Sequence, residues 1–204
     1  MALTRMMDAP EKILIRLPEA ATVVLLPGRL TSWKGQGVLI EALARINRRD
    51  VCGVLVGSDQ GRHHYSSGLV KRSEALGIGD RLRLVGQCDD MPAALMLADV
   101  VVHASTQPEA FGRVVIEAQA MGRPVIASDL GGPAETVEQG ATGWRVPPGD
   151  ASALASAIER MLALNAEERA ALAERTRAAV QADYTVGAMQ AATLDVYREV
   201  IGLA

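Results

Sequence analysis

The chain has 204 residues, of which 49% are hydrophobic and 22% charged, and its formal net charge is −3. This is the composition of an ordinary globular protein, and the length is enough for one sizeable hydrophobic core. Basic residues are scattered along the sequence and only 3% of residues are aromatic, so the pattern argues against nucleic acid as a partner. The longest uncharged apolar runs are far shorter than the about 20 residues that cross a bilayer, so we expect no membrane span.

The cellular compartment can be inferred from two further features. Residues 1–16 contain no continuous apolar core followed by a small-residue cleavage site, so we expect no secretory signal. The two cysteines, Cys52 and Cys88, match no metal-ligand spacing, and we expect reduced thiols rather than a disulfide. Both features predict a cytoplasmic protein.

Short apolar runs alternate with segments of helical periodicity from residue 22 onward, which is the pattern of βαβ units around a parallel sheet. Most of these runs are apolar throughout, as expected for strands that helices cover on both faces. The predicted strands span residues 22–28, 51–57, 81–86, 98–105, 123–128 and 143–147. The predicted helices between them span residues 36–48, 62–76, 91–97, 113–122 and 133–139.

The sequence after Pro148 changes to Ala, Leu, Glu and Arg at helical spacing, which predicts about three C-terminal helices. Asp150 and Asn165 are the expected N-caps of the first two, because their side chains can accept hydrogen bonds from free backbone amides. Residues 1–21 are less regular, and we interpret them as a linker or remnant segment. The predicted fold of residues 22–204 is α/β, a Rossmann-like, doubly wound parallel sheet of about six strands with C-terminal helices.

The loop after the first predicted strand, PGRLTSWKGQG, places two cations beside a glycine. Ligands of open parallel sheets bind at the carboxyl ends of the strands, which is where this loop begins. Gly28 permits close backbone approach, Arg29 offers a planar fork to phosphate oxygens, and Lys34 offers a mobile point charge. The next helix, which should begin near Gly35, would direct free amides to the same place. The loop is compatible with a diphosphate site and also with two solvated cations.

The loop after the fourth predicted strand, HASTQPEAFGRVVIEA, holds two glutamates. Glu109 precedes Phe111 and Gly112, where the glycine would expose amides that form an anion site. Glu109 is either an acceptor for ligand hydroxyls or an ordinary solvated loop acid. Glu117 lies at the edge of the buried face of the following helix, where a carboxylate needs a hydrogen-bonding partner. We expect that partner to come from a ligand, such as a ribose diol, rather than from the protein.

Other chemistries have less support in the sequence. The glycine turn VGSDQG after the second strand matches neither the Walker pattern nor G-x-G-x-x-G, which disfavours a P-loop NTPase and an NAD enzyme. His63 and His64 are adjacent and would diverge on a helix, so we expect no metal site there. His103 ends a strand and is expected near a ligand. Neither a G-x-S-x-G turn nor the order Ser-His-Asp occurs, so acyl hydrolysis has no support.

As a set, these motifs resemble a known family. The stretches PGRLTSWKG, RLRLVGQCDDMPAALMLADVVVHAST and EAQAMGRPVIASDLGGPAETVEQGATGWRVPPGD, with seven residues between Glu109 and Glu117, are similar to the donor-binding, C-terminal half of retaining glycosyltransferases of family 4. The similarity extends over roughly residues 22–200 and lies in the order and spacing of the whole set. It implies one half of a GT-B fold that binds a nucleotide-diphosphate sugar of UDP, GDP or ADP type.

The resemblance also implies catalytic roles for three residues. Arg29 and Lys34 would hold the diphosphate and stabilise the leaving group, a role that a metal has in other transferases, so neither a metal nor another cofactor is expected. Glu109 would contact sugar hydroxyls. The physical basis would be electrostatic stabilisation of the departing diphosphate by preorganised cations and amides.

Substrate-binding roles are implied for eight more positions. Glu117 would bind the ribose, and GQCDD resembles the loop that borders the base. The backbone of four residues at the next helix would lie near the sugar and phosphates. The implied substrate-binding residues are Gly28, Cys88, Asp90, Phe111, Gly112, Arg113, Val114 and Glu117.

Complete members of that family also have an N-terminal, acceptor-binding domain, and the residues before 22 are too few to form one. We therefore expect an acceptor domain in cis or in trans, with any peripheral membrane association made only through it. The last helix, around MQAATLDVYREVIG, resembles the segment that crosses back to that domain. Its apolar face would be left exposed, and self-association is one expected outcome.

Three hypotheses follow from the sequence. The first is a retaining glycosyltransferase that moves a hexosyl or related sugar from a nucleotide diphosphate to an unknown acceptor, this chain alone being inactive without its acceptor domain. The alternative is a catalytically incomplete nucleotide-sugar-binding or assembly module that acts with a separate acceptor-domain chain. A third keeps the fold for epimerisation or phosphorolysis.

Overall fold

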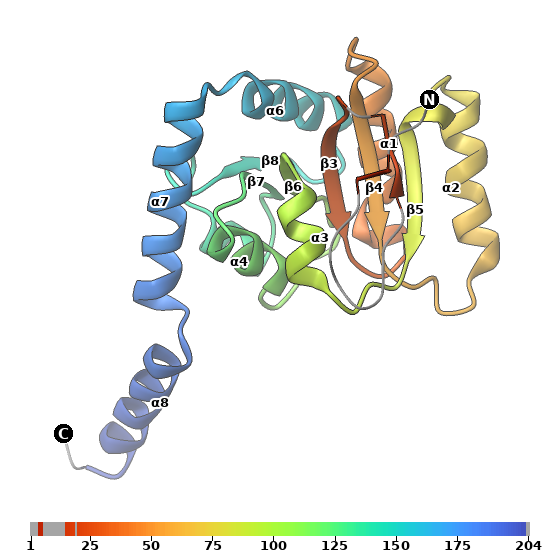
Figure 1. Cartoon of the computed structure of the whole chain (residues 1–204). Helices are drawn as coiled ribbons and strands as arrows, with labels where there is room; N and C mark the ends of the chain where they lie inside the picture. The colour runs from red at the N-terminus through yellow and green to blue at the C-terminus, as the bar shows by residue number, and fades with distance from the viewer. Residues whose placement is uncertain (1–3, 6–14, 19, 203–204) are drawn as a thin grey trace.

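The computed structural model of the chain describes residues 4–5, 15–18 and 20–202 (Figure 1). Its centre is a six-stranded sheet. The strands are β3 (Thr22–Pro27), β4 (Val51–Val56), β5 (Leu82–Gly86), β6 (Val100–His103), β7 (Val125–Ser128) and β8 (Trp144–Val146). All neighbouring strands are parallel, in the order β5-β4-β3-β6-β7-β8.

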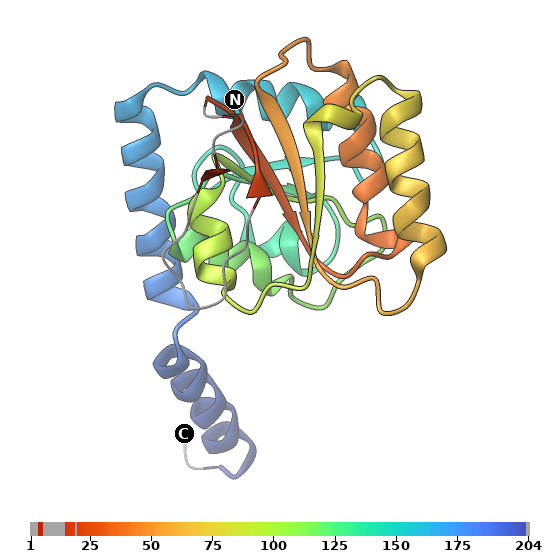
Figure 2. The same ribbon diagram turned by 45° about the vertical axis from the view of Figure 1, so that its right-hand side comes forward.

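Helices connect these strands and cover both faces of the sheet (Figure 2). The predicted strands and helices are confirmed, with ends that differ by a few residues, and so is the α/β, Rossmann-like fold class. The helices in the described residues are α1 (Gln36–Arg45), α2 (His63–Ala75), α3 (Met91–Leu97), α4 (Arg113–Ala120), α5 (Gly132–Thr136), α6 (Ala151–Ala163), α7 (Ala166–Asp183) and α8 (Val186–Val200), with short 3-10 turns η1 (Ser32–Lys34) and η2 (Gly79–Arg81).

The central strand β3 is the point at which the chain reverses its direction across the sheet. From β3 the chain moves outward to β4 and β5, and then returns to form β6 on the other side of β3. The crevice outside the carboxyl ends of β3 and β6 is therefore a topological switch point. Open α/β sheets bind their ligands in such a crevice.

Two hydrophobic cores lie on the two faces of the sheet. Alternate residues of a strand point to opposite faces, so Val24 and Leu26 belong to the core that includes α1 and α6, whereas Val23 and Leu25 belong to the core that includes α3 and α4. All four side chains are at most 1% exposed. Full burial of one such side chain stabilises the fold by about 1.5–3 kcal/mol, so the two cores hold the strand ends rigidly in place.

The C-terminal helices begin at the predicted caps. The Asp150 carboxylate accepts hydrogen bonds from the amides of Ser152 and Ala153, both at 2.9 Å. Asn165 forms a reciprocal capping box with Glu168. α7 then packs against α4, whereas α8 extends away from the body of the molecule (Figures 1 and 2).

The described residues of α8 bury no side chain. No helix in the described residues is long and apolar enough to cross a bilayer. The exposed apolar side chains of α8 and of the turn after it are Val186, Met189, Leu194, Val196, Tyr197, Val200 and Ile201.

Two short strands, β1 (Thr4–Arg5) and β2 (Ile15–Arg16), pair antiparallel before the main sheet begins. Leu17, two residues after the start of β2, is buried in the same core as Val23. The division of the chain at residue 22 into a linker and a domain stays a prediction.

Candidate functional site

Two loops meet at the switch point and bring opposite charges together. The loop between β3 and α1 holds Lys34, and the loop between β6 and α4 holds Glu109. They approach closely at Gly35, the N-cap of α1, where φ is +76° and an added Cβ would overlap the carbonyl oxygen of Ala104. Only glycine fits this contact, so Gly35 sets the distance between the two loops.

Trp33 strengthens the junction of these loops. Its carbonyl oxygen accepts a hydrogen bond of 2.7 Å from the amide of Thr106, which joins η1 to the loop after β6. The Lys34 ammonium lies 4.6 Å from the centre of the Trp33 ring, within the range of a cation–π interaction. Both contacts restrict where the Lys34 ammonium can lie.

The carboxylate of Glu109 accepts hydrogen bonds from three side chains. Lys34 donates from Nζ to Oε2 at 2.7 Å, and Nε2 of His103 lies 2.7 Å from Oε1. The hydroxyl of Ser105 also donates to Oε1. The side chains of Lys34 and Glu109 are only 15% and 16% exposed, so this ion pair is largely shielded from water. Charge-assisted hydrogen bonds of this kind are stronger than neutral ones.

The pKa of Glu109 reflects this environment. Burial by itself raises the pKa, but the hydrogen bonds from His103, Lys34 and Ser105 outweigh burial and lower the pKa to about 2. The carboxylate is therefore ionised at neutral pH. It can accept hydrogen bonds but cannot donate one.

A cavity of about 520 Å³ opens beside this ion pair. It brings together most of the residues that the sequence predicted for the site. Gly28 and Lys34 come from the loop after β3, whereas Glu109 and Glu117 come from the segment after β6. The full lining is Pro27, Gly28, Lys34, Met91, Glu109, Ala110, Phe111, Gly112, Arg113, Val114 and Glu117.

The start of α4 forms another wall of the cavity. Its N-cap, Gly112, has φ +75°, and among the described residues no acceptor pairs with the backbone amides of Arg113 and Val114. Two free amides and the positive end of the helix dipole favour an anion at this place. Phe111, which precedes the helix, packs edge-on against Tyr184 with ring centres 5.9 Å apart.

Glu117 has a partner within the protein, contrary to our expectation. Its Oε1 accepts a hydrogen bond of 3.0 Å from Nη2 of Arg113, one helical turn earlier. The side chain of Glu117 is 39% exposed and that of Arg113 is 84% exposed. The apolar periodicity of α4 predicted that Glu117 lies at the edge of the core. In the structure this face of the helix lines the cavity, where the side chain is accessible to water.

Three predicted site residues do not line this cavity. Arg29 is exposed in the loop after β3, and its guanidinium pairs with no other described residue, while its carbonyl accepts a hydrogen bond from Gln36. Asp90 caps α3 by accepting a hydrogen bond of 2.9 Å from the amide of Ala93. Cys88 is half-buried against the core, and burial raises the pKa of its thiol. Cys52 and Cys88 are both free.

The sequence did not identify Ser105 as part of the site. His103 and Ser105 are two positions apart at the end of β6, so they face the same side of the strand. The spacing of two between His103 and Ser105, just before the loop that holds Glu109, was the signal that could have identified Ser105. Within the described part of the chain, no three His, Cys, Asp or Glu side chains gather as a metal site would require.

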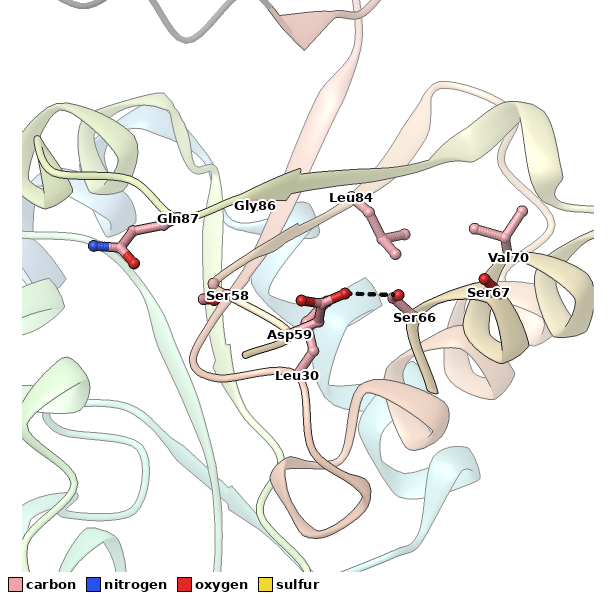
Figure 3. Close-up of a pocket in the computed structure, with 10 residues that line it drawn as sticks. Leu30, Ser58, Asp59, Ser66, Ser67, Val70, Leu84, Gly86 and Gln87 are labelled. Carbon is pink, nitrogen blue, oxygen red and sulfur yellow. Dashed lines mark hydrogen bonds between the residues drawn. The ribbon is translucent and has the colours of Figure 1, made fainter. Parts of the chain in front are cut away.

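A second cavity, of about 390 Å³, lies at the carboxyl ends of β4 and β5 on the α2 side (Figure 3). Its apolar lining includes Leu30, Val70 and Leu84. Its acidic group, Asp59, already accepts hydrogen bonds from the side chain of Ser66 at 3.1 Å and from the amide of Gly61 at 3.0 Å. The first cavity is the better candidate, because it combines an ion pair with free helix amides.

Comparison with known proteins identifies the family. The family described as "Glycosyl transferases group 1" matches residues 11–179. The chain belongs to this family. A D-inositol 3-phosphate glycosyltransferase of Salinispora tropica is 36% identical over 200 residues, which cover 91% of this chain and 40% of that protein.

Solved structures of glycosyltransferases have a similar fold. A glycosyltransferase from Rickettsia africae has a TM-score of 0.85 and 32% identity, and the match covers 90% of this chain and 49% of that one. HepE of Anabaena, solved in complex with UDP-glucose, has a TM-score of 0.75 and 37% identity, over 79% of this chain and 44% of that one. This chain thus spans less than half the length of these three relatives.

Proposed function

We propose that this chain is the donor-binding, C-terminal half of a retaining glycosyltransferase of family 4, and forms one half of a GT-B fold. The complete enzyme would transfer a hexosyl or related sugar from a nucleotide diphosphate to an acceptor. The observation that carries the proposal is the Lys34–Glu109 ion pair, which lies in one cavity with the free amides of α4. A cation, an oriented carboxylate and helix amides suit a ligand that combines phosphates with hydroxyls.

The proposed chemistry needs cations that remain available to phosphate oxygens. The Lys34 ammonium has three donor hydrogens and gives one to Glu109, so two remain. Arg29, in the same loop, would add a planar fork, and the amides of Arg113 and Val114 would complete the site. These groups would stabilise the negative charge that develops on the departing diphosphate, without a metal or another cofactor.

The two glutamates would bind different parts of the donor. Glu109 would accept a hydrogen bond from a sugar hydroxyl, and Glu117, half-exposed on the wall of the cavity, would accept one from the ribose. Cys88 and Asp90 would border the base, mainly through their backbone. The complex of HepE with UDP-glucose supports a nucleotide-diphosphate sugar as the ligand class.

Calorimetric titration of UDP, GDP and ADP tests the proposal. We expect one of them to bind the wild type below millimolar concentration, and the double variant Arg29→Ala/Lys34→Ala to lose most of that affinity. The matched control is Arg49→Ala/Lys71→Ala, which removes the same two charges at exposed positions that do not line the cavity. Absence of nucleotide binding, or equal binding by both double variants, would rule out the assigned site.

We further propose that another domain, in the same chain or in a second one, supplies the acceptor site in the cytoplasm. The chain covers 40% to 49% of the relatives described above, which leaves room in them for such a domain. The exposed apolar side chains of α8 would contact that domain, or a second copy of this chain when the domain is absent.

Light scattering on the purified chain tests the role of α8. We expect concentration-dependent association that Val196→Asp abolishes, since this substitution puts a charge on the apolar surface of the helix. Gln190→Asp, at an exposed polar position of the same helix, is the matched control and should leave association unchanged. A wild type that is monomeric at every concentration would reject self-association.

A further inference from the structure

His103 is a buried polar residue whose purpose the proposed function does not yet explain. It ends β6 and is 4% exposed. Its Nε2 lies 2.7 Å from Oε1 of Glu109 and 3.4 Å from the hydroxyl oxygen of Ser105. Its Nδ1 is buried and has no hydrogen-bond partner among the described residues. Because burial of an unpaired nitrogen is unfavourable, the contact with Glu109 must compensate for it.

The protonation of the imidazole follows from its partner. The Glu109 carboxylate is ionised and can only accept hydrogen bonds, so Nε2 of His103 must carry the proton and donate it. Nδ1, on the other side of the ring, is buried and has no partner among the described residues. The structure thus fixes the orientation of the His103 ring, with the N–H of Nε2 directed at Glu109.

The acceptor capacity of the carboxylate is nearly used up. Each carboxylate oxygen can accept about two hydrogen bonds. Among the described residues, Oε1 accepts from His103 and Ser105, whereas Oε2 accepts from Lys34 alone. One acceptor position is left, on Oε2 and next to the Lys34 ammonium, where Glu109 and Lys34 both line the cavity.

We propose that His103 is a positioning residue that acts through Glu109 and sets the contribution of the donor sugar to binding. By holding Oε1, His103 fixes the carboxylate so that its one free acceptor position is presented to a sugar hydroxyl. Without this hydrogen bond Oε1 is held, among the described residues, by the Ser105 hydroxyl alone, and the carboxylate can rotate toward Lys34. The sugar then loses its oriented acceptor, while the nucleotide part of the ligand keeps its contacts. The inference rests on the proposed function.

Two substitutions of His103 separate positioning from packing. In His103→Gln the side-chain amide nitrogen can occupy the place of Nε2 and donate to Glu109. In His103→Asn the amide nitrogen reaches only the place of Nδ1, so the hydrogen bond to Glu109 is lost although a polar side chain remains. Circular dichroism and thermal unfolding establish that both variants are folded.

The first measurement compares two ligands by calorimetry: the nucleoside diphosphate that binds the wild type best among UDP, GDP and ADP, and its glucose conjugate. We expect His103→Asn to lower the affinity for the glucose conjugate about tenfold relative to the affinity for the nucleotide alone. His103→Gln should restore most of this lost affinity. An unchanged ratio in His103→Asn overturns the inference. An equal loss of affinity for both ligands also overturns it, because that result would indicate a structural role.

The second measurement needs no nucleotide. Nitrogen NMR of the His103 imidazole should show the tautomer protonated at Nε2, and Glu109→Gln should change its signals. An Nε2 without a proton would overturn the inference whatever the ligand. Failure of every nucleotide to bind the wild type would instead reject the proposed function, so the two failures can be told apart.

Discussion

Glu109 and Glu117 line the same cavity, but the two regions that hold them differ in almost every physical respect. Glu109 lies in a loop fixed by contacts to a neighbouring loop, accepts three hydrogen bonds and has a pKa lowered to about 2. Glu117 lies on a helix, is 39% exposed and, within the described part of the chain, pairs only with an exposed arginine of the same helix. One region is assembled by the tertiary fold and the other by a single turn of helix. The first should therefore be sensitive to substitution and the second tolerant of it.

The largest effect should come from breaking the loop contact that places Lys34 beside Glu109. Gly35→Ala would force a Cβ into the carbonyl of Ala104 at a positive φ, and we expect it to lower the free energy of unfolding by about 4 kcal/mol. Gly61→Ala is the control, since Gly61 has a similar φ of +79° but no atom of the described residues lies within 4 Å of the added Cβ. Its cost should be about 1 kcal/mol. Equal costs in urea unfolding would show that the contact is unimportant.

The next effect is the pH dependence that the Glu109 carboxylate contributes to stability. A pKa lowered from 4.5 to about 2 contributes about 3 kcal/mol of stability above pH 4.5, and this contribution is lost as the pH falls through 2. The stability difference between wild type and Glu109→Gln should therefore shrink by roughly 2 kcal/mol between pH 7 and pH 3. Urea unfolding at several pH values measures it. A difference independent of pH would contradict the lowered pKa.

A smaller effect should separate the ligand contacts of the two glutamates. If Glu117 binds the ribose, the wild type should prefer UDP to 2′-deoxy-UDP, or the corresponding pair for another base, by about tenfold. Glu117→Gln should remove most of this preference, whereas Glu109→Gln should keep it. Calorimetry measures the affinities of the three proteins (wild type, Glu117→Gln and Glu109→Gln) for each of the two nucleotides. If the preference for UDP remains in Glu117→Gln, a residue other than Glu117 contacts the ribose.

The smallest effect concerns the Arg113–Glu117 pair. Because both side chains are substantially exposed, Arg113→Ala should change the free energy of unfolding by less than about 0.5 kcal/mol. Addition of 1 M salt should remove whatever change is seen, since the Debye length is then only about 3 Å. A larger, salt-independent loss would mean that Arg113 makes a contact beyond Glu117.

Much of this fold could be predicted from the sequence, because its signals are local. Apolar runs of strand length, helical periodicity between them and cap residues such as Asp150 and Asn165 each report on a few neighbouring positions. The parallel arrangement of the strands followed from the alternation of strands and helices, whereas their order in the sheet comes from the structure. The parallel arrangement placed the candidate site at the carboxyl ends of β3 and β6.

The side-chain partners in the site were harder to predict. The pairing of Arg113 with Glu117 could have been read from their spacing of four, but the apolar pattern of α4 suggested burial instead. The partners of Glu109 come from two loops. The sequence sign that these loops approach closely is the glycine at position 35, where a Cβ would overlap the Ala104 carbonyl. Arg29 does not line the cavity, and its neighbour Leu30 donates a backbone hydrogen bond of 3.0 Å to Ser58, a contact between distant segments that the local sequence does not specify.

Trp33 gives the site an optical signal. Its indole lies 4.6 Å from the Lys34 ammonium, and the chain has only one other tryptophan, Trp144, in the edge strand β8. An anion that draws the ammonium away from the ring would change the electric field at Trp33 and leave Trp144 as a constant background. Fluorescence of the unlabelled protein should then report occupancy of the cavity directly.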